Sequence, residues 1–182
     1  DKPKKQIKYK KARALQSKTA KKMAKVYEAL EEVDEKGEPK PDMETVVEIL
    51  TELRNDKENL KSYDRSVMWN SWAYVYFSEE KYELAMDSYE KLIAEPEVTL
   101  PLRVGALLSL AQLNMVQGDY QKGINLILQW MDEVETVTAQ SWSLLGSAYY
   151  QIGNFKKSMS SMETAILMAE EEGYKPKENW YN

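Results

Sequence analysis

The stretch W-S-L-L-G-S-A-Y-Y-Q-I-G-N-F-K-K-S, Trp142 to Ser158, decides the fold of this chain. It sets the small residue Gly146 among larger apolar side chains at helical spacing, breaks at Gly153-Asn154 and resumes with Phe155. A glycine can adopt the left-handed conformation that ends a helix, and an asparagine that follows it can cap the next helix. The stretch therefore predicts two helices joined by a tight turn.

Two earlier stretches repeat this pattern. They read W-N-S-W-A-Y-V-Y-F-S-E-E-K-Y-E-L-A, Trp69 to Ala85, and L-L-S-L-A-Q-L-N-M-V-Q-G-D-Y-Q-K-G, Leu107 to Gly123. Aligned on their turns, the three windows start 38 and 35 residues apart. Such a period is typical of arrays of helix pairs, which stack because no pair can bury its apolar face alone. The middle window is the least regular, since Asn114 and Gly123 depart from the pattern.

These positions resemble the tetratricopeptide repeat, whose pattern is W-x2-L-G-x2-Y, then A-x3-F, then A. The third window fits at Trp142, Leu145, Gly146, Tyr149, Gly153, Phe155 and Ala165, and the first fits at Trp69, Ala73, Tyr76, Tyr82, Ala85 and Tyr89. The resemblance implies an all-α fold, a right-handed superhelical solenoid of about four antiparallel helix pairs. It also implies that the protein binds another protein.

The rest of the chain divides around these repeats. An amphipathic pattern after residue 18 is broken at Gly37–Pro41, and Asp42 is placed to cap a second helix. We therefore predict a basic leader at 1–18, an atypical helix pair at 19–61, three repeats within 62–176, and the start of a truncated helix at 177–182. The three repeats are expected at about 66–99, 104–137 and 139–172.

The composition narrows the chemistry that is available. The 182 residues include no Cys and no His, which removes the thiolate nucleophile, the imidazole base and the two best transition-metal ligands. A carboxylate or lysine enzyme stays possible, but the acidic residues fall mostly at solvent-facing helix positions. We predict that the protein is not an enzyme and has no cofactor or metal. No stretch is long and apolar enough to span a bilayer.

Charge is distributed unevenly along the chain. Residues 1–25 hold eleven Lys or Arg against one Asp, whereas the remainder holds fourteen against twenty-nine acidic residues. A basic arm on an acidic body can bind anionic lipid, nucleic acid or an acidic protein face. The simpler interpretation is a solvated, partly helical leader. Nucleic acid is the less favoured partner, because only Tyr9 interleaves the lysines.

Two segments support a narrower resemblance. Ser62 to Phe77 (S-Y-D-R-S-V-M-W-N-S-W-A-Y-V-Y-F) and Gly173 to Trp180 (G-Y-K-P-K-E-N-W), with the upstream K-V-Y-E-A-L helix, are similar to periplasmic tetratricopeptide proteins encoded beside TonB genes in Gram-negative bacteria. The resemblance implies a periplasmic accessory of the TonB–ExbB–ExbD machinery, which powers outer-membrane uptake. The alternative is a cytosolic adaptor or regulator whose basic arm contacts nucleic acid or an acidic partner. The oligomeric state does not follow from the sequence.

The repeat resemblance also implies a binding face. In such proteins the first helix of each pair lines the concave face, where ligand peptides lie. Helical phase gives nine candidates: Asn70, Tyr74, Phe77, Leu108, Gln112, Met115, Ser143, Ser147 and Tyr150. None is Lys or Arg, which argues against a clamp for acidic C-terminal peptides and favours an extended or helical segment held by apolar anchors and amides. The alternative is that some of them, Leu108 and Met115 above all, pack against neighbouring helices.

Overall fold

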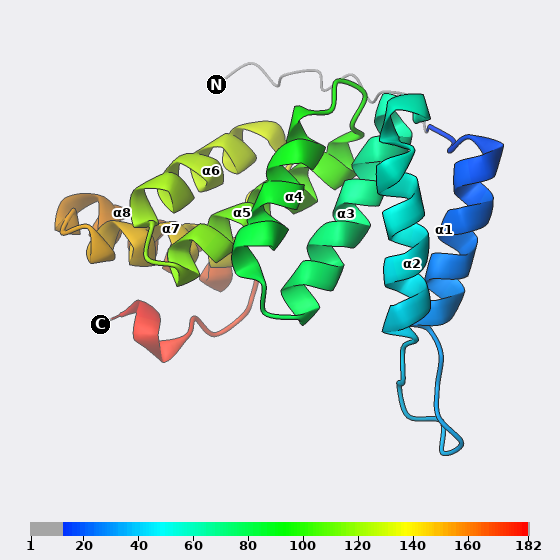
Figure 1. Ribbon diagram of the computed structural model, residues 1–182. Coiled ribbons are helices and arrows are strands. Elements are labelled where there is room, and N and C mark those ends of the chain that lie inside the picture. The colour runs from blue at the N-terminus through cyan, green and yellow to red at the C-terminus, as the bar shows by residue number, and fades with distance from the viewer. Residues whose placement is uncertain (1–12, 182) are drawn as a thin grey trace. The chain divides into compact units, whose positions relative to one another are not determined.

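The structure, a computed structural model, describes residues 13–181 as an all-helical chain (Figure 1). Its eight α-helices form four consecutive pairs: α1 (Ser17–Leu30) and α2 (Met43–Asn55), α3 (Ser62–Ser78) and α4 (Tyr82–Ala94), α5 (Leu100–Val116) and α6 (Tyr120–Glu133), and α7 (Ala139–Gln151) and α8 (Phe155–Glu171). Two short 3-10 helices, η1 (Lys57–Asn59) and η2 (Glu178–Trp180), complete it. No strand occurs within residues 13–181, where the only strand-like pairing is an isolated bridge between Val33 and Pro39. The all-α prediction is confirmed.

The chain divides into two compact units, and the division falls within α5. The N-terminal unit ends at Ala106 and the C-terminal unit begins at Leu107. In the N-terminal unit, α1 to α4 follow one another, each packed against the next (Figure 1). In the C-terminal unit, α7 packs against both α6 and α8. Each unit is thus built from helices that are neighbours in sequence.

Helix starts and turns agree with the sequence pattern. The second helices of the three repeats begin at Tyr82, Tyr120 and Phe155, as predicted. Asp42, Asp119 and Asn154 cap α2, α6 and α8, each accepting a hydrogen bond from the backbone N–H three residues later. Left-handed φ angles of 58°, 85° and 74° at Glu80, Gly118 and Gly153 end the first helices.

Some predicted boundaries differ from those of the structure. Helix α1 begins at Ser17, inside the segment predicted as leader, and residues 1–12 lie outside the described residues. Helix α5 begins at Leu100 rather than near 104, because Pro101 lies in its first turn, where a missing N–H costs nothing. The predicted start of a helix at 177–182 is the single turn η2; Asn182 is outside the described residues.

The core of the N-terminal unit is built around Trp72. Its indole is 3% exposed, its Nε1–H donates to the Leu50 carbonyl at 3.3 Å, and the Tyr76 ring stacks on it with centroids 5.1 Å apart. The Arg54 guanidinium lies 4.2 Å from the ring centroid and donates to the Tyr76 hydroxyl at 2.9 Å. Arg54 lies on α2 and both aromatic residues on α3, so these contacts join the atypical pair to the first repeat.

The core of the C-terminal unit relies on small residues instead. A Cβ added to Gly146 of α7 would meet the Met162 side chain of α8 at 3.0 Å, and one added to Gly123 of α6 would meet Met115 of α5 at 2.6 Å. Ala165 and Ala169 of α8 are fully buried. Helices approach closely where side chains are this small, so α7 packs tightly on α8, and α6 on α5.

Candidate functional site

A groove of about 340 Å³ lies on the C-terminal unit. It is formed by α5, by the first turns and outer face of α7, and by the segment after α8. Its lining residues are Leu108, Gln112, Thr138, Gln140, Ser141, Ser143, Leu144, Ser147, Lys177 and Trp180. Four of the nine predicted binding residues, Leu108, Gln112, Ser143 and Ser147, are therefore brought together in one groove.

Local helix geometry places the polar side chains in this groove. Ser143 and Ser147 are four residues apart on α7 and therefore share one face of the helix. Gly146, on the side of α7 that faces α8, lets the two helices approach closely. The Thr138 hydroxyl caps α7 by accepting from the Ser141 N–H at 3.3 Å, which fixes where the helix begins. The hydroxyls therefore face the groove as a consequence of how the pair packs.

Several groove side chains keep their hydrogen-bonding capacity. The Thr138 and Ser141 hydroxyls bond to each other at 3.0 Å. By contrast, within residues 13–181 no hydrogen bond engages the side chains of Gln112, Gln140, Ser143 or Ser147, which are half-buried or exposed. Amides and hydroxyls both donate and accept, so they can pair with the N–H and C=O groups of a peptide main chain.

The segment after α8 supplies one wall of the groove. Gly173, with φ of 80°, ends α8, and the Tyr174 N–H returns to the Ala169 carbonyl at 2.9 Å. The chain then continues to Trp180, which is 6% exposed and packs with Ala139, Ala165 and Ala169 in a small apolar cluster. Sequence reasoning missed this wall. The only signal for it was the P-K-E-N-W motif, whose role depends on tertiary packing.

Two predicted residues of the C-terminal unit lie outside this groove. Met115 is 8% exposed and fills the space beside Gly123, so it is part of the core between α5 and α6. This is the alternative that the sequence left open for Met115. Tyr150 is 59% exposed, and its ring meets Phe155 edge-on with centroids 5.5 Å apart.

The three predicted residues of the N-terminal unit lie on an open face of α3. Asn70 is exposed, and the rings of Tyr74 and Phe77 are 49% and 51% exposed. Phe77 meets Tyr82 of α4 edge-on, with centroids 5.8 Å apart. This face is more aromatic than the groove of the C-terminal unit, and its residues remain predicted binding residues.

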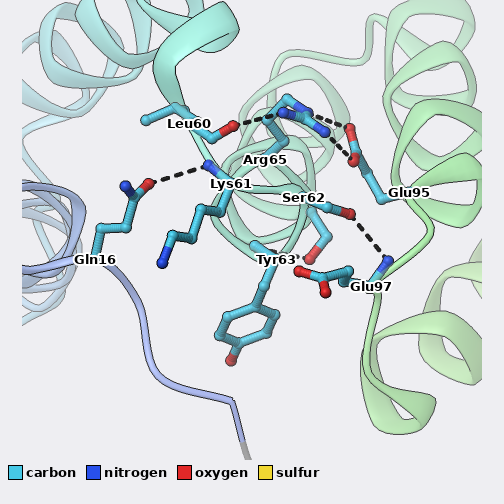
Figure 2. Close-up of polar contacts among 9 residues, drawn as sticks. Gln16, Leu60, Lys61, Ser62, Tyr63, Arg65, Glu95 and Glu97 are labelled. Atoms are coloured by element: carbon cyan, nitrogen blue, oxygen red, sulfur yellow. Dashed lines mark hydrogen bonds and ion pairs between the residues drawn. The ribbon is translucent and has the colours of Figure 1, made fainter.

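A polar cluster surrounds the start of α3 in the same unit (Figure 2). The Arg65 guanidinium donates to both carboxylate oxygens of Glu95, at 2.7 and 2.9 Å, and to the Leu60 carbonyl at 2.6 Å. The hydrogen bonds to Glu95 raise the pKa of Arg65 above its ordinary value. The Ser62 hydroxyl accepts from the Glu97 N–H at 2.9 Å. These contacts fix the end of α4 and the loop after it against α3.

The same cluster secures the residues that precede α1. The Gln16 side-chain oxygen accepts from the Lys61 N–H at 3.0 Å, as Figure 2 shows, and the Gln16 N–H donates to Asp64 Oδ1 at 3.0 Å. Arg13 forms an ion pair with Glu97 at 2.7 Å. Asp64 is 1% exposed, and its Oδ2 has no hydrogen-bond partner among the described residues. The cluster thus tethers residues 13–16, a role that sequence reasoning missed.

A hollow of about 460 Å³ lies beside this cluster, lined by Lys57, Glu58, Arg65, Trp69, Lys91, Ala94, Glu95 and Pro96. Its charges are largely used within the protein. Arg65 pairs with Glu95, and Lys91 pairs with Asp87 while its ammonium lies 4.8 Å from the centroid of the Trp69 ring. The hollow is therefore a poorer candidate site than the groove.

Nothing in residues 13–181 assembles three or more acidic residues into a group that could hold a metal ion. Across the same residues, no helix combines the length and apolar character needed to cross a membrane.

Comparison with known proteins supports the repeat architecture. The sequence model of the tetratricopeptide repeat matches residues 66–95 and 139–172. These residues coincide with the pairs α3–α4 and α7–α8; the middle pair, where the pattern is least regular, is not among the matched residues. No curated protein matches the sequence.

Solved structures with a similar fold include the crystal structures of MamA, RapI and BtubC. MamA is 19% identical, with a TM-score of 0.51, over 58% of this chain and 55% of that chain. The apo form of RapI is 12% identical, with a TM-score of 0.66, over 87% and 58%. BtubC from P. vanneervenii is 14% identical, with a TM-score of 0.57, over 88% and 77%. The chain spans little more than half the length of the MamA and RapI chains, and the likeness concerns the fold. Residues 66–95 and 139–172 thus match the tetratricopeptide repeat, within an all-helical fold of helix pairs.

Proposed function

We propose that the protein is a non-enzymatic scaffold that holds a peptide segment of another protein in the groove of its C-terminal unit. The observation that carries this proposal is the groove itself, where Gln112, Ser143 and Ser147 offer unused hydrogen-bonding groups beside the apolar Leu108 and Leu144. Unused amides and hydroxyls beside apolar side chains suit a main chain with alternating side-chain anchors.

A groove-filling variant tests this proposal. Ser147→Trp places a large side chain on the exposed face of α7, whereas Ser160→Trp makes the same change on the exposed face of α8, away from the groove. Both proteins, tagged and purified, would be compared with the wild type for the partners they capture from an extract of their own cell. We expect Ser147→Trp to lose the specific partner and Ser160→Trp to retain it. Equal capture by the two variants would contradict the proposed site.

The finer proposal is that the partner belongs to a TonB system and that the protein is a periplasmic accessory of TonB-dependent uptake. Its support is the resemblance carried by Ser62–Phe77 and Gly173–Trp180. Purified periplasmic parts of TonB, ExbB and ExbD would be tested for binding to the wild type and to Ser147→Trp. Binding that only the wild type retains supports the proposal; absence of binding to all three, or recovery of cytosolic proteins alone, argues against it. Fractionation of cells producing the full-length gene product would test the compartment.

A second candidate function follows from the basic arm. Residues 1–25 hold eleven Lys or Arg against a single Asp, which suits a cytosolic adaptor that contacts nucleic acid or an acidic protein. Titration with duplex DNA and with RNA at low and moderate salt tests whether the protein binds nucleic acid. Binding that weakens steeply with salt supports it, and absence of binding at low salt removes it.

A further inference from the structure

Helix α8 carries its charges in the reverse of the order that stabilises a helix. Its first turn holds Lys156 and Lys157 with no acidic residue, and its last turn holds Glu170 and Glu171 with no basic residue. The helix dipole favours acidic residues at the N-terminus and basic residues at the C-terminus. Helices α2 and α4 follow that rule, since each has an acidic first turn and a basic last turn. The order of charges in α8 is therefore unfavourable for the helix on its own.

The described part of the chain does not neutralise these charges. The Lys157 ammonium lies 5.2 Å from the centroid of the Tyr149 ring, on the side of the helix that faces α7. The side chains of Lys156, Glu170 and Glu171 are exposed and form no ion pair or hydrogen bond with any of residues 13–181. A basic end and an acidic end of one helix thus remain open to solvent.

Five exposed residues of α8 form one face whose spacing reads the same in both directions. They are Lys156, Met159, Glu163, Leu167 and Glu170, separated by 3, 4, 4 and 3 positions. Steps of three and four keep residues on one side of a helix, and α8 buries a different side against α7. The side chains of Met159 and Leu167 are 62% and 59% exposed. The face therefore has an apolar residue on each side of its centre and opposite charges at its two ends.

A second copy of the same face complements this pattern when the two helices run antiparallel. A twofold axis at Glu163 brings Lys156 of each copy opposite Glu170 of the other, and Met159 opposite Leu167. Antiparallel helices also place the N-terminus of one beside the C-terminus of the other, so the acidic end of each copy lies beside the basic end of its partner. This neighbour offsets the unfavourable order of charges in α8. Glu163 meets its own copy at the axis and makes the like-charged contact of the arrangement.

From these observations we propose that α8 is a self-association face, through which two copies of the chain form a weak antiparallel dimer. Two ion pairs and two apolar contacts make a small interface of the transient class. Because the ion pairs are exposed, salt weakens the dimer. None of the five residues of this face lines the groove, so the dimer does not depend on the proposed function.

Sedimentation equilibrium of the whole chain, from micromolar to millimolar concentration, measures the dimer directly. By symmetry, Lys156→Glu and Glu170→Lys each turn two ion pairs into two like-charged contacts, and we expect each to weaken the dimer about tenfold at low salt. The matched control Lys157→Glu makes the same charge change on the side that faces Tyr149 and should leave the dimer nearly unchanged. An equal mixture of Lys156→Glu and Glu170→Lys should form a heterodimer about as stable as the wild-type dimer, since both ion pairs form again with their signs exchanged.

Two neutral changes test the middle of the face. Glu163→Gln removes the like-charged contact at the axis and should tighten the dimer about threefold. Leu167→Gln removes apolar contacts and should weaken the dimer about fivefold, whereas Leu128→Gln, at a leucine of α6 that is 43% exposed, should not weaken it. Far-ultraviolet circular dichroism of every variant checks that the helices are retained.

Any of four results would overturn the proposal. The first is a wild type that stays monomeric at millimolar concentration. The second is an equal loss for Lys156→Glu and Lys157→Glu. The third is a mixture of Lys156→Glu and Glu170→Lys that associates no better than either variant alone. The fourth is a weaker dimer for Glu163→Gln, which would place the axis elsewhere.

Discussion

The pairs α3–α4 and α7–α8 reach the same turn geometry with different residues. In the first pair Glu80 takes the left-handed conformation with φ of 58°, and the Lys81 N–H bonds to the Tyr76 carbonyl at 2.8 Å. In the second pair Gly153 takes it with φ of 74°, and the Asn154 N–H bonds to the Tyr149 carbonyl at 2.9 Å. A positive φ is energetically unfavourable for glutamate. The packing of the first pair, and not its turn residues, therefore imposes the turn.

The two pairs also share an aromatic contact and differ on their open faces. Phe77 meets Tyr82 in the first pair as Tyr150 meets Phe155 in the second, edge-on in both. Earlier on the open face of the first helix, α3 carries Asn70 and Tyr74, whereas α7 carries Ser143 and Ser147 at the equivalent positions. Side chains that close the hairpin are kept, while those that face outward change. The two pairs therefore differ on the face that is predicted to bind a ligand.

The largest expected effect comes from truncating Trp72 and Leu145, which occupy equivalent core positions in the two pairs. Both are almost fully buried, but Trp72 also stacks on Tyr76 and lies under Arg54. Trp72→Ala should lower the free energy of unfolding by about 4 kcal/mol and Leu145→Ala by about 3 kcal/mol. Urea denaturation followed by far-ultraviolet circular dichroism measures both. A smaller loss for Trp72→Ala would mean that the aromatic stack contributes less than its burial indicates.

Exchanging the turn residues tests whether packing imposes the turn. Gly153→Ala puts a Cβ at a positive φ and should cost about 1 kcal/mol of unfolding free energy. Glu80→Gly relieves the same strain in the other pair and should stabilise by about 0.5 kcal/mol, because a flexible unfolded chain offsets part of the gain. Thermal and urea unfolding of both variants give the two signs. Destabilisation by Glu80→Gly would show that the glutamate side chain makes a favourable contact that outweighs its backbone strain.

The caps differ between the pairs as well. Asn154 accepts from the Lys157 N–H at 3.3 Å, whereas Lys81 provides no side-chain cap for α4. Asn154→Ala should therefore cost about 0.7 kcal/mol, and Lys81→Asn should gain a similar amount. The same unfolding experiments apply, with Lys156→Ala, an exposed position on α8, as the control for the first change. Equal stability of Asn154→Ala and the control would show that the Asn154 cap does not contribute to stability.

The smallest effect concerns alkaline pH. A hydrogen bond with Glu79 at 2.7 Å raises the pKa of Lys81 above its ordinary value of 10.5. At the second turn Ile152 takes the place of Glu79 and Asn154 that of Lys81, and neither side chain titrates. A raised lysine pKa contributes stability that is complete below 10.5 and is lost as the pH rises through the folded value. The stability difference between wild type and Lys81→Gln should therefore shrink above pH 10.5. A difference that stays constant from pH 9 to 11.5 would contradict this.

Much of the fold could be predicted because it depends on local sequence. Turn glycines, caps at Asp42, Asp119 and Asn154, and the starts of the second helices all follow from residues close in the chain. For Met115 the structure agrees with the packing alternative that the sequence left open, because the side chain fills the space beside Gly123.

The candidate site was predictable only in part. Helical phase found the residues that α5 and α7 contribute, since their spacing follows from one helix. It could not find Lys177 and Trp180, because their place depends on three alanines from two helices forming a seat for the indole. The position of this wall of the groove is determined by interactions between segments that are distant in sequence.

The position of Trp180 has a practical consequence. Its indole borders the groove while being shielded from water, so a molecule entering the groove changes the environment of a natural fluorophore. Comparing the emission of the wild type with that of Trp180→Phe isolates this signal from the four other tryptophans. The protein can thus report occupancy of its own groove without a label.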